Sequence, residues 1–477
     1  MIETVLAVTA ILYLALRIED RFSIPSPLSL IALSYVFYTV APEIGIASDA
    51  GQFAKLVLVL LPILLIADSM ELRVEELKEH GLSLFYLAVV TVALSVLTAV
   101  LLSDWLFGQY HLSVAATIVL FAMVMATDPV SVVSIFSRFE LPHSLKILCE
   151  GESLFNDATA LIVFVFIGLY ALEGGEITAA YVGEISVFVV LGSAALGMVF
   201  GYVGLAALKT TENRIAEMMV IIFTGYGAFA LAEHFYVLLN VFGGHSHMHL
   251  SGILSCIFAT VTVNHWMTKE TDYGESRLSR EEEDLRHETA QERPSRRLID
   301  SALAKIKVTV AEQQRHFRTK EDIQLLALVA NTMLFVAMAE IVRPALLLHY
   351  WKEILVMFLA TTVIRAVMMA KFAIITNQTD KMRDVNFRWW GVLTFAGIKG
   401  GLSIVMVTMI PTSFEHLEMF QAVVIGVVLL STFVYSLVLL AMIARYAADF
   451  RREKEEEARE EAAAQSSHGA SAVMDSA

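Results

Sequence analysis

The chain has 477 residues, of which 57 % are hydrophobic and only 17 % are charged, and its formal net charge is −15. A soluble globular protein carries about 25 % charged residues, so this composition excludes an ordinary soluble protein. Apolar stretches of about twenty residues, the length that crosses a bilayer core, recur along the whole chain. A transmembrane β-barrel is also excluded, because its segments would be shorter and would alternate between apolar and polar residues.

Apolar segments that predict transmembrane helices follow one another in a regular series. They lie near 2–17, 26–47, 53–68, 83–106, 111–136, 145–172, 181–208, 215–240, 248–266, 323–343, 351–376, 389–410 and 418–446. The predicted fold class is therefore an all-α polytopic membrane protein with about 13 transmembrane helices. The N-terminus lacks a basic region and a small-residue cleavage site, so we expect the first segment to be a retained helix.

Lysine and arginine are concentrated in alternate loops, beginning with the loop after the first predicted helix. Because cytoplasmic loops carry an excess of these residues, the pattern predicts an N-terminus outside and a C-terminus in the cytoplasm. Arg343 and Lys352 are the main exceptions.

We expect 267–322 to be a charged cytoplasmic insertion with one or two amphipathic helices. The segment 447–477 is predicted to be a charged cytoplasmic tail, a short helix followed by disorder.

Ionisable residues within the apolar segments are the first candidates for function, because each costs about 2.5–3.5 kcal/mol at the bilayer centre. In 126-ATDPVSVVSIF-136, Asp128 lies between Thr127 and Pro129. Proline removes a backbone donor and breaks a helix, and transporters use such breaks to build binding sites. The alternative is a simple proline kink with an aspartate near a helix end.

The stretch 151-GESLFNDATALIVFVFIGLYAL-172 places several polar residues directly before an apolar run. At helical spacing Ser153 and Asp157 share one face, as do Glu152 and Asn156. Together with Asp128 from a neighbouring helix, this face offers oxygen ligands of the kind that hard cations such as Na⁺ prefer. The alternative is that Ser153 or Asn156 only caps a helix that begins late.

Two further charges lie deep in predicted helices. Arg365 stands well inside 357–376 and cannot lose its proton, so it needs a partner unless it reaches an interface. Its candidate counter-ions are Glu150, Glu152 and Glu340.

Lys399 lies among the glycines of 391-GVLTFAGIKGGLSIVMV-407, which predicts a second interrupted helix, seven helices after the first break. That separation is expected of two inverted repeats of six helices joined by a linking helix at 181–208. A glycine-rich packing seam is the alternative.

These residues together resemble a known transporter family. Thr127-Asp128-Pro129, Glu152-Ser153 with Asn156-Asp157, Arg365 and Gly397-Ile398-Lys399-Gly400-Gly401 are similar, in this order, to the motifs of the NhaP/NHE-type sodium:proton antiporters of the cation:proton antiporter-1 family. The stretch 249-HLSGILSCIFA-259 is similar to another helix of that family. The resemblance extends through residue 446. Lys399 departs from it, since the family commonly has arginine at this position.

The resemblance implies a homodimer whose subunit has a mobile core and a dimerisation region. The core would comprise residues 83–172 and 351–446, and the dimerisation region residues 1–68 and 215–343. Asp157 would be the carboxylate shared by cation and proton, and Asp128, Ser153, Asn156 and the Thr127 backbone would complete or order the site. Glu152 and Arg365 would form a structural ion pair. The pair Asn156-Asp157 resembles the electroneutral branch of the superfamily.

We therefore expect an antiporter, not an enzyme, that exchanges Na⁺ or Li⁺ for H⁺ in a cell membrane, with the bacterial inner membrane as the expected site. The expected partners are monovalent cations, protons, lipid and a second copy of the chain, with no nucleic acid, no cofactor and no resident metal. A K⁺/H⁺ antiporter, a cation channel and a membrane sensor are the alternatives.

A further motif is a stretch of alternating histidines, His245, His247 and His249. It could bind a metal or sense pH, or it could be an ordinary solvated loop.

Overall fold

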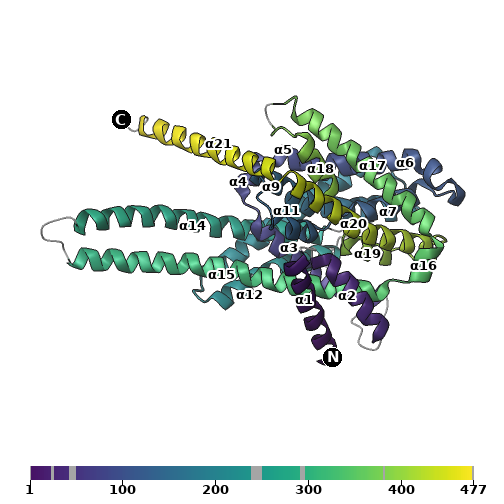
Figure 1. Ribbon diagram of the computed structural model, residues 1–477, viewed down its shortest axis with the longest axis horizontal. Coiled ribbons are helices and arrows are strands. Elements are labelled where there is room, and N and C mark those ends of the chain that lie inside the picture. The colour runs from purple at the N-terminus through teal and green to yellow at the C-terminus, as the bar shows by residue number, and fades with distance from the viewer. Residues whose placement is uncertain are drawn as a thin grey trace. The chain divides into compact units, whose positions relative to one another are not determined.

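The computed structural model describes residues 2–22, 26–41, 50–237, 250–289, 296–379 and 382–474 (Figure 1). Within these ranges the regular structure is helical throughout and contains no strand. Eight of the described helices are long and apolar enough to cross a membrane, and Ser26–Val40 and Val114–Met125 are shorter apolar helices. The predicted all-α polytopic fold is therefore confirmed. The number of about 13 crossings and the inverted repeat remain predictions.

The chain forms two compact units, and unit 1 contains both stretches of the predicted mobile core. It comprises residues 1–59, 76–183 and 332–477. Its helices are α1 (Ile2–Phe22), α2 (Ser26–Val40), α5 (Gly81–Phe85), η2 (Tyr86–Val90), α6 (Thr91–Phe107), η3 (Gly108–Tyr110), α7 (Val114–Met125), α8 (Pro129–Phe136), α9 (His143–Ile162), η4 (Val163–Leu169), α10 (Tyr170–Leu172), α16 (Pro344–His349), α17 (Trp351–Thr376), α18 (Phe387–Phe395), α19 (Gly401–Thr408), α20 (Leu417–Arg445) and α21 (Ala447–Met474). Residues 1–59, which the family resemblance assigns to the dimerisation region, also belong to this unit.

Unit 2 comprises residues 60–75 and 184–331. It holds α12 (Arg214–Glu233) and α14 (Gly252–Thr289), with parts of α3 (Ala50–Glu71), α11 (Ala179–Leu208) and α15 (Arg296–Ile341), while α4 (Val74–Glu79) lies at the boundary between the units. Glycines let α11 approach α14 closely, because a Cβ at Gly197 would stand 2.4 Å from the Ser255 carbonyl oxygen. α14 and α15 run antiparallel as a long hairpin (Figure 1), in which Gln313 donates to the Thr271 carbonyl at 3.1 Å. The one or two amphipathic helices expected in 267–322 are thus extensions of the neighbouring apolar helices.

The first interruption in unit 1 separates α7 from α8. Ser113 begins α7 by accepting a hydrogen bond from the Ala116 amide at 3.1 Å, as N-cap residues do. α7 ends at Met125, and α8 begins at Pro129, a position where the missing N–H costs nothing. Asp128, directly before this proline, accepts a hydrogen bond from the Ser131 hydroxyl at 2.6 Å. Pro129 therefore starts a new helix after an extended break, which is more than a kink.

The second interruption separates α18 from α19 at residues 396–400. Asn386 caps the start of α18 by accepting from the Trp389 amide at 3.0 Å. Both interruptions occur where the sequence predicted them. The helix that faces them, α9, continues through η4 and α10 as one span of 30 residues, His143–Leu172.

Two parts of the chain differ from expectation, and a third lies outside the description. The backbone of α21 is helical to Met474, which is longer than the short helix expected at the start of the tail. α2 ends at Val40, before the end of the predicted segment 26–47. His245, His247 and His249 lie outside the described residues, so the metal and pH hypotheses for them stay untested.

Candidate cation-binding site

The two interrupted helices meet at their breaks. The Asp128 amide donates to the Ile398 carbonyl at 2.7 Å, which joins the first break directly to the second. A Cβ at Gly400 would stand 2.7 Å from the Asp128 Cβ, so glycine is required for this approach. The breaks therefore place four helix ends together: the C-terminal ends of α7 and α18 and the N-terminal ends of α8 and α19. These ends carry partial charges of opposite sign.

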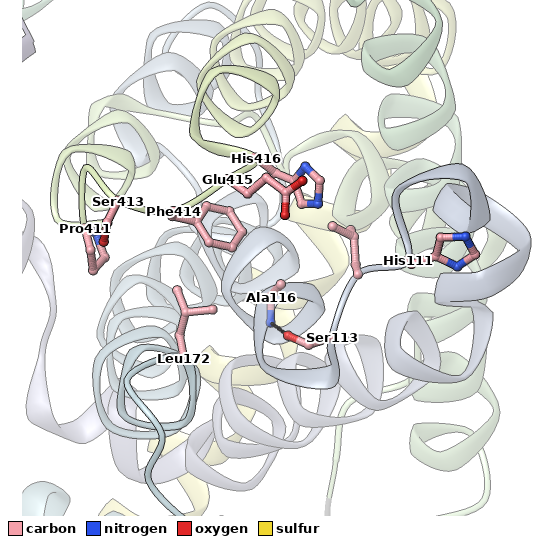
Figure 2. Close-up of a pocket in the computed structure, with 10 residues that line it drawn as sticks. His111, Ser113, Ala116, Leu172, Pro411, Ser413, Phe414, Glu415 and His416 are labelled. Carbon is pink, nitrogen blue, oxygen red and sulfur yellow. Dashed lines mark hydrogen bonds between the residues drawn. The ribbon is translucent and has the colours of Figure 1, made fainter.

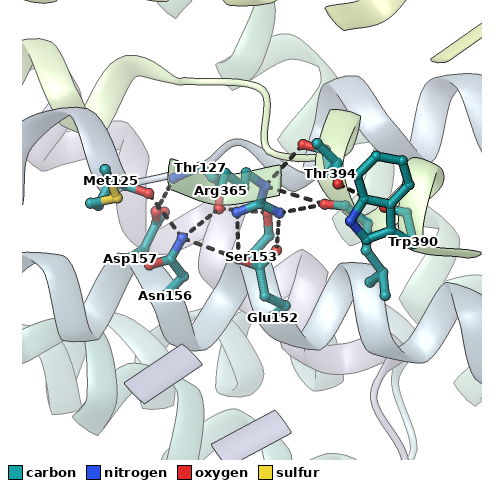
Figure 3. A network of polar contacts seen from close by, with 10 residues as sticks. Met125, Thr127, Glu152, Ser153, Asn156, Asp157, Arg365, Trp390 and Thr394 are labelled. Carbon is teal, nitrogen blue, oxygen red and sulfur yellow. Dashed lines mark hydrogen bonds and ion pairs between the residues drawn. The ribbon is translucent and has the colours of Figure 1, made fainter. Parts of the chain in front are cut away.

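Polar side chains of α9 satisfy the free end of α7 (Figure 3). Asn156 donates through Nδ2 to the Met125 carbonyl oxygen at 2.9 Å. The Asp157 carboxylate accepts a hydrogen bond from the Thr127 amide at 2.9 Å. Because the last carbonyls of a helix and the amides after a break have no partner within the helix, α9 supplies partners that water would supply elsewhere.

Thr127 lies at the centre of this network. Its hydroxyl oxygen accepts from Ser153 Oγ at 2.8 Å and from Asn156 Nδ2 at 3.2 Å. Thr127, Ser153 and Asn156 are all buried, and Asp128 is partly exposed. The structure thus brings together all five residues predicted to bind the ion and proton, which are Asp157, Asp128, Asn156, Ser153 and Thr127.

Two acceptor atoms of this cluster remain open. Asp157 is only 7 % exposed, and its Oδ2 has no hydrogen-bond partner among the described residues. Within the same region of the chain, Asn156 Oδ1 is buried and no donor reaches it. Buried acceptors are nearly always satisfied, so the unpartnered Asn156 Oδ1 and the second oxygen of Asp157 leave acceptor capacity for a cation or a proton in this cluster.

Arg365 closes the other side of the network. It forms a bidentate ion pair with Glu152, at 2.9 Å from each carboxylate oxygen. The same guanidinium donates to the Leu393 carbonyl at 2.8 Å and to the Thr394 carbonyl at 3.0 Å. These carbonyls belong to the last turn of α18, where a cation is favoured. Of the three candidate counter-ions for Arg365, the structure therefore places Glu152 against it.

Glu340, another of the candidate counter-ions, lies in different surroundings. It lines a small cavity of about 100 Å³ together with Arg343 and Gln421.

Gly397 allows Arg365 to pack closely in its own site. A Cβ at position 397 would stand 2.3 Å from Arg365 Nε.

Lys399, the charge predicted within the second break, is also buried, with 3 % of its surface exposed. Its amide donates to Ser431 Oγ at 3.0 Å, which fixes the backbone at the break. Its ammonium group makes no hydrogen bond or ion pair to any described residue.

A second cavity lies at the other end of α7. It has a volume of about 370 Å³ and is lined by residues around Ser113 and by the loop that follows α19. Figure 2 shows the Phe414 ring and the Glu415 carboxylate beside the N-terminal turn of α7. Since α7 has 12 residues and a helix rises about 1.5 Å per residue, this cavity is separate from the network around Asp157.

Comparison with known proteins identifies the family to which this arrangement belongs. A profile of the family described as "Sodium/hydrogen exchanger, transmembrane" matches residues 5–275, more than half of the chain. The chain belongs to the sodium/hydrogen exchanger family. Among curated relatives of this exchanger, the "Na(+)/H(+) antiporter NhaH" of Halobacillus aidingensis is 25 % identical over 394 residues, covering 82 % of both chains. The protein of the same name from Halobacillus dabanensis is 23 % identical and covers 92 % of this chain and 96 % of its own.

A solved structure shares the fold of this exchanger along nearly its whole length. The sodium proton antiporter MjNhaP1 from Methanocaldococcus jannaschii aligns with a TM-score of 0.65 at 15 % identity, covering 94 % of this chain and 96 % of its own.

The sequence predicted the Thr127 backbone as part of the exchanger's site but missed most of the other main-chain groups there. The carbonyls of Met125, Leu393 and Thr394 and the amide of Asp128 also make hydrogen bonds there. Main-chain groups are the same in every residue, so only the position of each break could have predicted them. Ser131 and Ser431 were also missed, because isolated serines in apolar helices give no distinct signal.

Proposed function

We propose that this chain is a secondary antiporter that exchanges Na⁺ or Li⁺ for H⁺ across the membrane. The observation that carries the proposal is the buried Asp157 carboxylate. One oxygen accepts from the Thr127 amide, the other has no hydrogen-bond partner among the described residues, and the preceding residue of α9, Asn156, has a buried Oδ1 that no donor reaches. Family membership and the names of the curated relatives support sodium as the ion, whereas nothing in the site favours potassium.

Exchange follows from competition for one carboxylate. Na⁺ requires oxygen lone pairs, and the ionised Asp157 with Asn156 Oδ1 supplies them. Protonation converts one carboxylate oxygen into a donor and removes the charge that attracts the cation. The two ligands therefore exclude each other. One charge leaves for each that enters, so the exchange is electroneutral.

Asp128, Ser153 and Thr127 complete or order the ion site around this carboxylate, and the other charged groups hold it in place. The Glu152–Arg365 pair is neutral and fixes α9 against α18. Asp128 lies at the start of α8 and is partly exposed, which suits a group that connects the buried carboxylate with water. Lys399 offsets the charge of the two aspartates.

Transport then requires the site to face the two sides of the membrane in turn. We propose that the interrupted helices move together with α9 as the mobile core of a homodimer, with the N-terminus outside and the C-terminus in the cytoplasm of a bacterial cell. One unit of pH difference supplies about 1.4 kcal/mol per proton. In one-for-one exchange, that energy holds a tenfold cation gradient, enough for sodium and pH homeostasis.

The test is cation-driven proton movement in proteoliposomes that contain a pH-sensitive dye. Wild-type vesicles should exchange protons for Na⁺ and Li⁺ but not for K⁺, and Asp157→Asn vesicles should exchange none of them. Potassium-driven exchange at the sodium rate would assign the chain to K⁺/H⁺ exchange. Sodium-driven exchange by Asp157→Asn would remove Asp157 from the proposed role.

A further inference from the structure

The tail helix α21 contacts the beginnings of two helices that build the cation site. The contacts lie between Asp449 and Glu460, in a segment that the sequence predicts to be a charged tail. Two carboxylates one turn apart, Glu453 and Glu457, make most of them. Residues at this spacing share one face of a helix, so α21 presents a continuous acidic edge to both helices.

Glu457 caps α9. Pro142 stands at the N-cap position and provides no side-chain bond to the free amides of the first turn. Glu457 fills this role from another region of the chain, since its carboxylate accepts from the His143 amide at 2.6 Å and from the Ser144 amide at 3.0 Å. It is also bonded to the Ser144 hydroxyl, lies 3.2 Å from Arg383 and is only 2 % exposed.

Glu453 holds the start of α18 in a similar way. It accepts hydrogen bonds from the Trp389 indole at 2.8 Å and from the Asn386 amide group at 2.8 Å. It is also paired with Arg388. Asn386 is the N-cap residue of α18. Glu453 therefore holds in place the side chain that caps this helix.

The same two helices are joined a second time at the cation site. Arg365 links Glu152 of α9 to the Leu393 carbonyl of α18. Asp157 lies fourteen residues after the capped amide of His143, about 21 Å along α9 at 1.5 Å per residue. A helix is stiff over this length, so a shift or rotation at its first turn moves Asp157 relative to the Thr127 amide, which belongs to a different segment.

We propose that Glu457 and Glu453 are positioning residues for the cation site, through which α21 sets the alignment of α9 with α18. This inference rests on the proposed function, because it concerns the affinity of the same site for Na⁺. The competing view is that α21 only adds folding stability. The two views differ in the quantity that a substitution changes, which is the KM for Na⁺ in the first and the amount of folded protein in the second.

The experiment compares Glu457→Gln with Glu456→Gln in full-length protein reconstituted in vesicles. Glu456 is adjacent, carries the same charge and is exposed. Glu457→Gln should raise the KM for Na⁺ about threefold to tenfold, the range expected for a lost helix cap, with the maximal rate per folded protein retained. Glu456→Gln should match the wild type. An unchanged KM in Glu457→Gln, with only a lower yield, would overturn the proposal.

A second variant that disturbs fewer contacts tests the proposal if Glu457→Gln does not fold. Arg383→Gln removes one partner of Glu457 and leaves both capped amides in place, and it should raise the KM about twofold, a fraction of the effect of a lost cap. A wild-type KM in that folded variant would also count against positioning. Failure of the proposed function is distinguishable, since wild-type and Glu456→Gln vesicles would then show no sodium-driven exchange at all.

Discussion

Unit 1 and unit 2 each bury a glutamate beside an arginine, but the surroundings of the two carboxylates differ. In unit 2, Glu217 of α12 is 1 % exposed and has its Oε1 2.7 Å from His316 Nδ1. Its Oε2 lies 2.7 Å from Arg315 Nε, an ion pair without the angle of a hydrogen bond. Both oxygens of Glu217 thus have a cationic or titratable neighbour on the same helix, α15.

In unit 1 the corresponding pair, Glu152 and Arg365, is equally well matched, but Asp157 follows little more than one turn later with an open oxygen. Burial of a charge is therefore common to both units and does not by itself indicate transport. What distinguishes the site is an unfilled acceptor next to a filled network.

Two buried asparagines, one in each unit, differ in the same way. Asn264 in unit 2 donates to the Leu72 carbonyl at 2.8 Å, just as Asn156 donates to Met125, and each has a buried Oδ1 without a donor among the described residues. Only Asn156 has an open carboxylate as its neighbour in the sequence. The comparison predicts that equal changes in the two units will have unequal consequences.

The largest expected effect comes from removing the arginines. Arg365→Met leaves Glu152 buried without its bidentate partner, so it should destabilise the protein by about 3–5 kcal/mol. Arg315→Met should cost less, because Glu217 keeps His316 and Arg315 is 18 % exposed. Thermal unfolding in detergent measures both. Equal losses of stability would mean that the two networks do not differ as described.

The second effect concerns the space beside Arg365. Gly397→Ala places a methyl group against the guanidinium and should cost about 1–3 kcal/mol, with a lower rate of exchange. Gly401→Ala is the matched control, because a Cβ there meets nothing within 4 Å. Melting temperatures and vesicle assays of the two variants are compared, and equal tolerance of both would argue against the close packing around Arg365.

The third effect separates the two asparagines by function. Asn156→Ala removes an open oxygen from the site and should raise the KM for Na⁺ several-fold. Asn264→Ala should leave the KM unchanged and reduce stability by about 1 kcal/mol, the value of one hydrogen bond. Sodium titration in vesicles decides between them. A raised KM in both variants would remove the functional distinction between these residues.

The smallest effect is a pH dependence at Glu457. Burial alone would raise the pKa of this carboxyl, but bonds from Ser144 and His143 and the charge of Arg383 lower it below its ordinary value. A lowered pKa in the folded state means that Glu457 stabilises the protein above about pH 4.5 and that this contribution is lost as the pH falls through the folded pKa. The melting temperature should fall more steeply from pH 5 to pH 3 in the wild type than in Glu457→Gln. Parallel curves of melting temperature against pH for the two proteins would contradict this role of Glu457.

Much of the site could be predicted because its residues are unusual in apolar transmembrane segments. Asp128, Asp157, Arg365 and Lys399 are charged residues in apolar segments, and Pro129 and the glycines around Lys399 interrupt helices. Each of these features is local, so a single sequence reveals it. The choice among Glu150, Glu152 and Glu340 as the partner of Arg365 was not local. It depends on how α9 and α17 pack, so spacing along the chain left it open, and only the family resemblance pointed to Glu152.

The tail shows where sequence reasoning ends. In the run 453-EKEEEAREE-461, nothing distinguishes Glu457 from Glu456. One is 2 % exposed and caps α9, while the other is exposed to solvent. The difference arises from a contact between residues more than three hundred positions apart. Charge runs of this kind are usually solvated, so composition alone favoured a disordered tail.

The pairing of Glu152 with Arg365 also sets an order of events during synthesis. The two residues are 213 positions apart, and a chain that grows at about 5–20 residues per second needs roughly 10–40 s to add that length. During this interval α9 exists without its arginine, and the cap from Glu457 arrives later still. The nascent first half therefore carries Glu152 without its ion-pair partner until α17 has been made.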